Sequence, residues 1–140
     1  MSGGDRVLEA AKTLIGARFR LHGRDPDTGI DCLGLIGCTL AAVAPASRLP
    51  VAYGLRQRDW ARLLPLAAEL GLEDADPGGG PRPGDILLFE VGAWQVHLAI
   101  DDGEGAIIHA HAGLARVVHG RPDPSWMLSR RWRLATNPIK

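Results

Sequence analysis

The spacing of apolar residues changes between the two halves of this chain, and that change restricts the fold more than any other feature of its sequence. In the first half, apolar residues recur at helical spacing, as in residues 5–15, after which Gly16 is placed to end a helix. After the Gly- and Pro-rich segment 76–84, short apolar runs are separated by Gly-containing turns, which predicts an antiparallel meander of strands. This order indicates an α+β fold in which N-terminal helices pack on a C-terminal antiparallel β-sheet.

The remaining elements follow from the same patterns. We expect two further helices, one from Cys32 to just before Pro45 and one over 59–71 with a kink at Pro65. We expect strands over 85–91, 94–101, 106–110, 114–119 and 130–135, an irregular loop over 17–29 and one helical turn over 123–128. The segment 76–84 is too short a hinge to divide the chain, so the 140 residues suit a single domain, residues 1–140.

The charge balance excludes several classes of partner. The sixteen basic and sixteen acidic residues cancel, so no global field attracts nucleic acid or an anionic membrane, and we expect neither as a partner. Arginines gather at 18–24 and 130–133, where a solvated face is the simpler interpretation. The N-terminus has no apolar signal core and no stretch is long enough to span a bilayer, which predicts a protein made in the cytoplasm without a signal peptide.

A cysteine opens the second predicted helix. Asp31 is a good N-cap, which places Cys32 at the first helical position, where the partial positive charge of the helix end favours the thiolate. The helix is apolar nearly all round and should be buried, and Gly34 and Gly37, one turn apart, would let another layer pack closely against it. Cys38 lies in mid-helix and is expected to be an inert core residue; the two thiols point in different directions and should both be free.

Two histidines fall on neighbouring predicted strands. If the turn over 101–105 is centred on Gly103, His97 lies directly opposite His109, on the same face of the sheet and within hydrogen-bonding reach. The other face then carries Leu98, Ile100 and Ile108, as a buried side requires.

A thiol, an imidazole and a group that orients the imidazole together make a nucleophilic triad. Cys32 would attack an amide carbonyl, His97 would take and return the proton, and His109 would orient His97. An alternative is a zinc site in which His109 and His111 act with His97 or Asp101. That alternative leaves the thiol at the helix start unexplained, so we expect no metal and no cofactor. A bulge in the hairpin would make His111 the third member of the triad instead.

Five stretches resemble the NlpC family of papain-like murein peptidases, especially its phage and gene-transfer-agent tail branch. They are Ile15-Gly16-Ala17-Arg18-Phe19, Asp31-Cys32-Leu33-Gly34-Leu35-Ile36, Arg82-Pro83-Gly84-Asp85-Ile86-Leu87-Leu88-Phe89, Val96-His97-Leu98-Ala99-Ile100 and Ile107-Ile108-His109-Ala110. The resemblance covers nearly the whole chain and implies a papain-like fold with a Cys-His-His triad on Cys32, His97 and His109.

The resemblance also implies an activity and a substrate. A cysteine endopeptidase of this family hydrolyses the stem peptide of peptidoglycan, commonly between γ-D-glutamate and the diamino acid. Many members carry Ser directly after the Cys and Tyr on the preceding loop, where this chain has Leu33 and Phe19. These two departures bear on the bond that is cleaved more than on the triad.

The tail branch implies a biological setting. On that hypothesis the protein is assembled with other tail-tip or hub proteins of a phage-like particle and is delivered to the target cell wall, where it opens peptidoglycan for DNA delivery. Two alternatives stay open: a non-enzymatic structural adaptor of the tail tip, or a thiol amidase or acyltransferase on the same scaffold.

Overall fold

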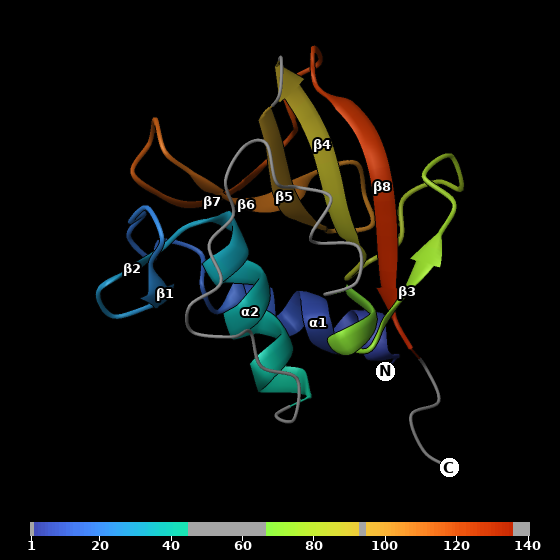
Figure 1. The fold of residues 1–140 in the computed structure, drawn as a ribbon, viewed down its shortest axis with the longest axis horizontal. Coiled ribbons are helices and arrows are strands. Elements are labelled where there is room, and N and C mark those ends of the chain that lie inside the picture. The colour runs from blue at the N-terminus through green and yellow to red at the C-terminus, as the bar shows by residue number, and fades with distance from the viewer. Residues whose placement is uncertain (1, 45–66, 93–94, 136–140) are drawn as a thin grey trace.

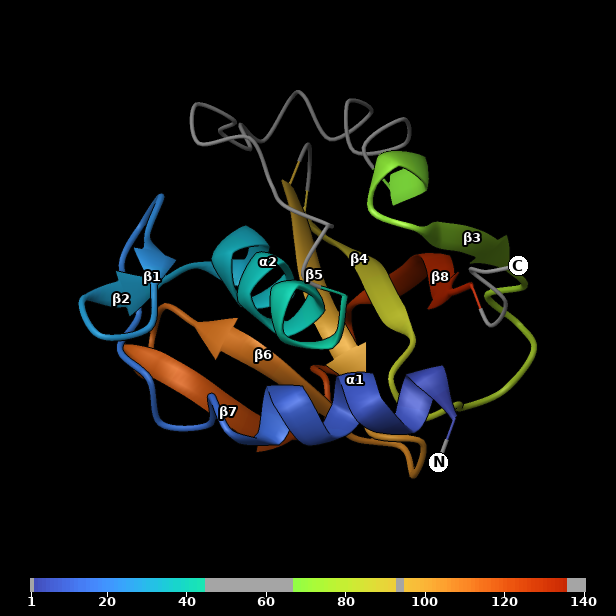
Figure 2. The ribbon, with the colours of Figure 1, turned by 90° about the horizontal axis from the view of Figure 1, so that it is seen from below.

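The structure is a computed structural model that describes residues 2–44, 67–92 and 95–135. It confirms an α+β fold in which two helices cover one face of an antiparallel sheet (Figures 1 and 2). The helices are α1 (Gly3–Lys12) and α2 (Cys32–Val43), and a two-stranded ribbon, β1 (Arg24–Asp25) and β2 (Gly29–Ile30), lies between them in the chain. Among the described residues, neither helix is long and apolar enough to cross a membrane.

The main sheet has six strands in the order β3-β8-β4-β5-β6-β7. In chain order they are β3 (Leu72–Ala75), β4 (Ile86–Gly92), β5 (Gln95–Asp101), β6 (Ile107–His111), β7 (Arg116–Gly120) and β8 (Met127–Leu134). Strands β4 to β7 form the predicted meander, but β8 returns to pair with β4. Strand β8 therefore lies between β3 and β4, so the last strand in the chain is not at the edge of the sheet.

The core lies between the helices and the sheet. As predicted, Leu98, Ile100 and Ile108 all point to this side and are at most 3 % exposed. The opposite face carries a smaller cluster of Leu87, Phe89, Ala99 and Ile107, with Val91, Trp126 and Leu128 packed around it. The period-2 alternation of β5 and β6 thus separates a helix-covered face from a second face that carries odd-numbered residues.

Helix α1 begins and ends differently from the prediction. Ser2 and Asp5 form a capping box, so the helix starts at Gly3 rather than at Asp5. It ends at Lys12, three residues before the predicted end, because the following turns carry the backbone to β7, where the Gly16 amide donates to the Val117 carbonyl at 2.9 Å. The contact with β7, together with the positive φ of 93° at Gly16, therefore takes the chain out of the helix.

Two strand predictions were wrong. The short strand β3 was not predicted, and β8 starts at Met127 inside the segment that we expected to form a helical turn. Both strands owe their form to pairing with distant partners, since β3 pairs with β8 and β8 with β4. Residues 67–69 of the predicted helix 59–71 are helical, and the rest of that prediction up to residue 66 lies outside the described residues.

The β5–β6 hairpin is shifted by two residues from the predicted register. Ile100 pairs with Ile108 and Asp101 with Ile107, so the connection is longer than a turn centred on Gly103 with Ile100 opposite Ala106. Asp102 makes this longer connection stable because its carboxylate accepts the amides of Glu104 at 2.7 Å and Ala106 at 3.0 Å. An even shift leaves every side chain on its predicted face.

Arg131 contradicts the interpretation of the C-terminal arginines as a solvated face. It is 5 % exposed and donates to Asp85 at 2.9 Å and to Asp101 at 2.7 Å. Arg133 adds two bonds of 2.9 Å to the Asp85 carboxylate. These four side chains tie β8 to the start of β4 and to the end of β5.

Candidate active site

Cys32 is the first residue of α2, as predicted. Its neighbour Asp31 caps the helix by accepting the Gly34 amide at 2.9 Å. The same carboxylate accepts the His22 amide and the Arg24 guanidinium, each at 2.9 Å. Asp31 therefore fixes the helix start and the loop before it with one side chain that is 7 % exposed.

Close packing holds that loop against the helix. A Cβ on Gly34 would collide with the Gly23 carbonyl oxygen, so the predicted close approach to this glycine is confirmed. Cys38, one and a half turns further on, is half-buried against the core and donates its thiol to the Arg24 carbonyl at 3.3 Å. That contact agrees with a packing role for Cys38.

The two histidines meet across β5 and β6. His97 Nε2 and His109 Nδ1 are 2.8 Å apart, and the two rings are nearly perpendicular with centroids 5.0 Å apart. Because the hairpin is shifted, the two residues are not directly opposite; they share a face on a diagonal that imidazole rings can span. The predicted hydrogen bond is present although the predicted register was wrong.

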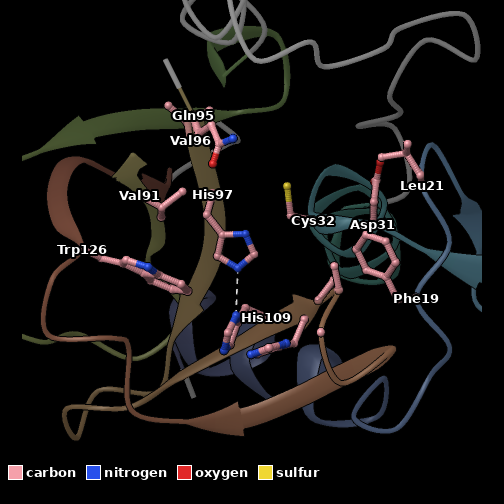
Figure 3. A pocket seen from close by; sticks show the side chains of 14 residues that line it. Phe19, Leu21, Asp31, Cys32, Val91, Gln95, Val96, His97, His109 and Trp126 are labelled. Atoms are coloured by element: carbon pink, nitrogen blue, oxygen red, sulfur yellow. Dashed lines mark hydrogen bonds between the residues drawn. The ribbon is translucent and has the colours of Figure 1, made fainter. Parts of the chain in front are cut away.

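The thiol and the histidine pair open into one pocket of about 410 Å³. In Figure 3 the ring of His97 stands between the side chain of Cys32 and the ring of His109. The wall is largely apolar, with Phe19 and Leu21 beside the helix start and Val91, Val96 and Trp126 beside the histidines. Its other polar members are Asp31, Gln95 and His111.

Trp126 is a site residue to which the sequence analysis assigned no role. Its ring centroid lies 5.1 Å from that of His97, 5.7 Å from that of His109 and 5.7 Å from that of Phe89. The sequence signal was weak, since a tryptophan in a short connection before a strand shows nothing about partners far away in the chain. Its effect is to cover one side of the histidine pair.

Burial controls the charge of the site. It raises the pKa of the Cys32 thiol to about 11, and the adjacent Asp31 carboxylate raises it further, while a backbone hydrogen bond from Leu98 opposes the shift. Burial also lowers the pKa of His97 to about 4, helped by the fields of His109 and His111, and lowers that of His109 to about 4. At neutral pH these shifts favour a neutral thiol beside neutral imidazoles, whereas the position of Cys32 at the helix start predicts a thiolate.

The zinc alternative finds no support in the geometry. Over residues 2–44, 67–92 and 95–135 no three His, Cys, Asp or Glu side chains are arranged to hold a metal ion. Asp101 turns away from the histidines to Arg131 and to the amides of Arg82 and Gly103. His111 Nδ1 lies 3.1 Å from the Leu114 amide, so it is His109 that contacts His97.

Comparison with known proteins gives a family and a fold. A sequence model of the NlpC/P60 family matches residues 16–133. Two solved structures, NlpC1 and NlpC2 from Trichomonas vaginalis, are 22% and 20% identical over 94% of this chain, with TM-scores of 0.69 and 0.67. This chain covers only 45% and 47% of those two chains, about half their length.

Two isolated domains match over nearly their full length. The NlpC/p60 domain of the peptidoglycan hydrolase SagA is 20% identical, with 94% of this chain and 98% of that one covered and a TM-score of 0.63. The P60 domain from the M. avium subspecies paratuberculosis antigen MAP1204 is 16% identical, with 96% of each chain covered and a TM-score of 0.65. These likenesses confirm the papain-like fold, whereas the search of curated proteins finds no match.

Proposed function

The chain belongs to the NlpC/P60 family, and from that premise we propose that it is a cysteine peptidase that hydrolyses peptidoglycan stem peptides, with Cys32, His97 and His109 as its catalytic residues. One observation carries the proposal. Cys32, at a capped helix start, shares a pocket with a histidine whose far nitrogen is bonded to a second histidine at 2.8 Å. This is the arrangement of nucleophile, base and orienting group that acyl transfer requires.

The proposed roles determine the tautomers of the two histidines. His97 Nε2 faces His109, so the nitrogen that can accept the thiol proton is His97 Nδ1. For Nδ1 to be a base, Nε2 must carry the hydrogen and donate it to His109 Nδ1, which leaves the hydrogen of neutral His109 on its own Nε2. His109 therefore orients His97 and stabilises the imidazolium that forms during the reaction.

The proposed reaction has two halves. The Cys32 sulfur attacks the amide carbonyl while its proton passes to His97, and the tetrahedral intermediate then expels the amine, which takes that proton. A water molecule next attacks the thioester, gives a proton to His97, and releases the acid as the thiol is restored. We assign the oxyanion to backbone amides in the first turn of α2.

The protonation states of Cys32 and His97 before substrate binds affect the order of the proposed steps. Burial raises the pKa of the thiol to about 11 and lowers that of His97 to about 4, which favours the neutral pair over a thiolate–imidazolium pair before substrate binds. We therefore propose that the proton moves as the carbon–sulfur bond forms, and that substrate filling the pocket shields this step from water.

The finer parts of the proposal concern the bond and the setting. The resemblance of the motifs supports cleavage between γ-D-glutamate and the diamino acid, with Leu33 and Phe19 in place of Ser and Tyr as the main departures. The resemblance to the tail branch supports assembly with tail-tip proteins of a phage-like particle and delivery to a target cell wall. Mass spectrometry of purified particles tests the setting, and particles free of this protein would refute it.

The test of the activity is the release of muropeptides from purified sacculi, with the products identified by mass. Wild type is expected to release fragments whose new termini identify the bond, and Cys32→Ala is expected to release none. Cys38→Ala is the matched control and should retain activity, because that thiol packs against the core and donates to the Arg24 carbonyl. Equal release by wild type and Cys32→Ala would refute the assigned nucleophile. If folded wild type released nothing, a structural tail subunit would replace the peptidase as the proposed function.

A further inference from the structure

His111 is a pocket residue that the proposed mechanism does not use. It is the last residue of β6 and lies on the same face as His109, two positions further along the strand. Its ring centroid is 5.5 Å from that of His109, with the planes tilted by 53°. It lines the same pocket as Cys32. Because His109 already forms the hydrogen bond to His97, the proposed triad does not need His111.

The turn after β6 fixes the ring of His111. The Leu114 amide donates to His111 Nδ1 at 3.1 Å, and the Ala115 amide closes the turn on the Ala112 carbonyl at 3.0 Å. A Cβ on Gly113 would come within 3.0 Å of His111 Cε1 and 3.4 Å of Nδ1. The Nδ1–Cε1 edge of the imidazole therefore packs against the turn.

This contact determines the tautomer. A backbone amide can only donate, so Nδ1 is the acceptor and the ring hydrogen of a neutral imidazole lies on Nε2. Protonation of the ring would remove the acceptor and leave Nε2 a donor. Since Nδ1 is occupied by the Leu114 amide, Nε2 is the ring nitrogen that is left to bind a ligand in the pocket that His111 lines.

We propose that His111 is a substrate-binding residue whose Nε2–H donates to an oxygen of the stem peptide. This inference rests on the proposed function. Two residues along a strand correspond to about 7 Å, so the bound oxygen is one other than that of the scissile carbonyl beside Cys32. The acceptor is a peptide carbonyl or the free α-carboxylate of the γ-linked glutamate, and both take a hydrogen bond from an imidazole.

Two substitutions of His111 distinguish its proposed role as a donor to substrate from its role as an acceptor in the turn. His111→Asn keeps an oxygen that can accept the Leu114 amide but is too short to reach the substrate from the position of Nε2. His111→Gln is longer and can place an amide donor near that position. The substrates are synthetic L-Ala-γ-D-Glu-L-Lys peptides with the α-carboxyl of the glutamate either free or amidated.

His111→Asn is expected to raise KM about tenfold with little change in kcat, because a lost ground-state hydrogen bond weakens binding. His111→Gln should recover part of the loss, and both variants should melt near the wild-type temperature. A loss on both peptides identifies an acceptor other than the α-carboxylate of the glutamate, and a loss on the free acid alone identifies that carboxylate. Wild-type KM values for His111→Asn on both peptides would overturn the inference and leave the peptidase proposal standing.

Binding provides a readout that does not depend on turnover. Titration calorimetry with Cys32→Ala and with Cys32→Ala/His111→Asn should show about tenfold weaker binding in the double variant. Absence of binding by Cys32→Ala, together with absence of cleavage by wild type, would refute the peptidase proposal and this inference with it. A merely structural role for His111 would lower the melting temperature of His111→Asn without changing its affinity.

Discussion

At the scale of single residues, the displaced pKa values of Cys32 and His97 determine how the site responds to pH. His97 must be neutral to accept the thiol proton, so activity exists above the pKa of His97 and is lost as pH falls through it. Burial lowers this pKa to about 4, and the fields of His109 and His111 add to the effect. The acid limb of kcat/KM should therefore lie near 4, well below the ordinary histidine value.

Trp126 supplies part of that burial and offers a test. Replacing it with alanine admits water to both imidazoles, so the pKa of His97 should rise and the acid limb of kcat/KM should move up toward about 6.5. Trp126→Phe keeps a ring against the histidines and should move the limb little. The measurement is kcat/KM between pH 3.5 and 8 for the three proteins. An acid limb in Trp126→Ala that coincides with that of wild type would show that this side chain does not set the pKa.

The thiol gives a further prediction. With a pKa of about 11, Cys32 is almost entirely protonated at neutral pH, and its thiolate fraction grows about tenfold per pH unit below that value. The rate of alkylation by iodoacetamide should keep rising beyond pH 10. The experiment uses Cys38→Ala, so that only one thiol reacts. A rate that levels off below pH 8 would instead indicate a thiolate stabilised by the helix end.

At the scale of elements, local chemistry was predictable and distant pairing was not. The start of α2 could be predicted from the local sequence, because an N-cap residue accepts hydrogen bonds from amides within the same turn. The shared face of His97 and His109 could also be read, because strand alternation survives any even shift of register. The register itself could not, since it depends on how the Asp102 carboxylate accepts two amides inside the connection.

The features that the sequence did not predict also depend on contacts between distant parts of the chain. Trp126 meets the histidines only because β8 returns to pair with β4, and nothing in the local pattern of the last strand specifies that neighbour. The first helix ends early because Gly16 bonds to β7. Local sequence patterns predict which residues are candidates for catalysis. They do not predict which aromatic ring from a distant part of the chain packs against those residues.

At the scale of the whole molecule, the buried ionic cluster connects stability to the site. Asp101 lies at the end of β5, where its carboxylate accepts Arg131 and the amides of Arg82 and Gly103. The turn that follows Asp101 sets the register between β5 and β6. This register places His97 and His109 diagonally across the two strands, where their rings form a hydrogen bond. We therefore expect Arg131 to support the histidine pair from the other end of β5.

Breaking this cluster should destabilise the fold and weaken the site together. Arg131→Met leaves Asp101 buried without its cation, and the loss of one partner from a buried pair costs about 3–5 kcal/mol. Arg130→Met, one residue earlier on β8 and only half-buried, is the matched control and should cost less than about 0.5 kcal/mol. Urea unfolding measures both. Adding Asp101→Asn to Arg131→Met should recover part of the stability, because the uncompensated charge is then gone.

The same pair of variants tests whether the cluster also acts on catalysis. Under conditions where Arg131→Met is still folded, the turn after β5 has lost one of its fixed contacts, so kcat/KM on stem peptides should fall while Arg130→Met keeps the wild-type value. If Arg131→Met lost stability but kept full activity, the register of the hairpin would be held by Asp102 and its amides alone. The ionic cluster would then serve only to join β8 to the centre of the sheet.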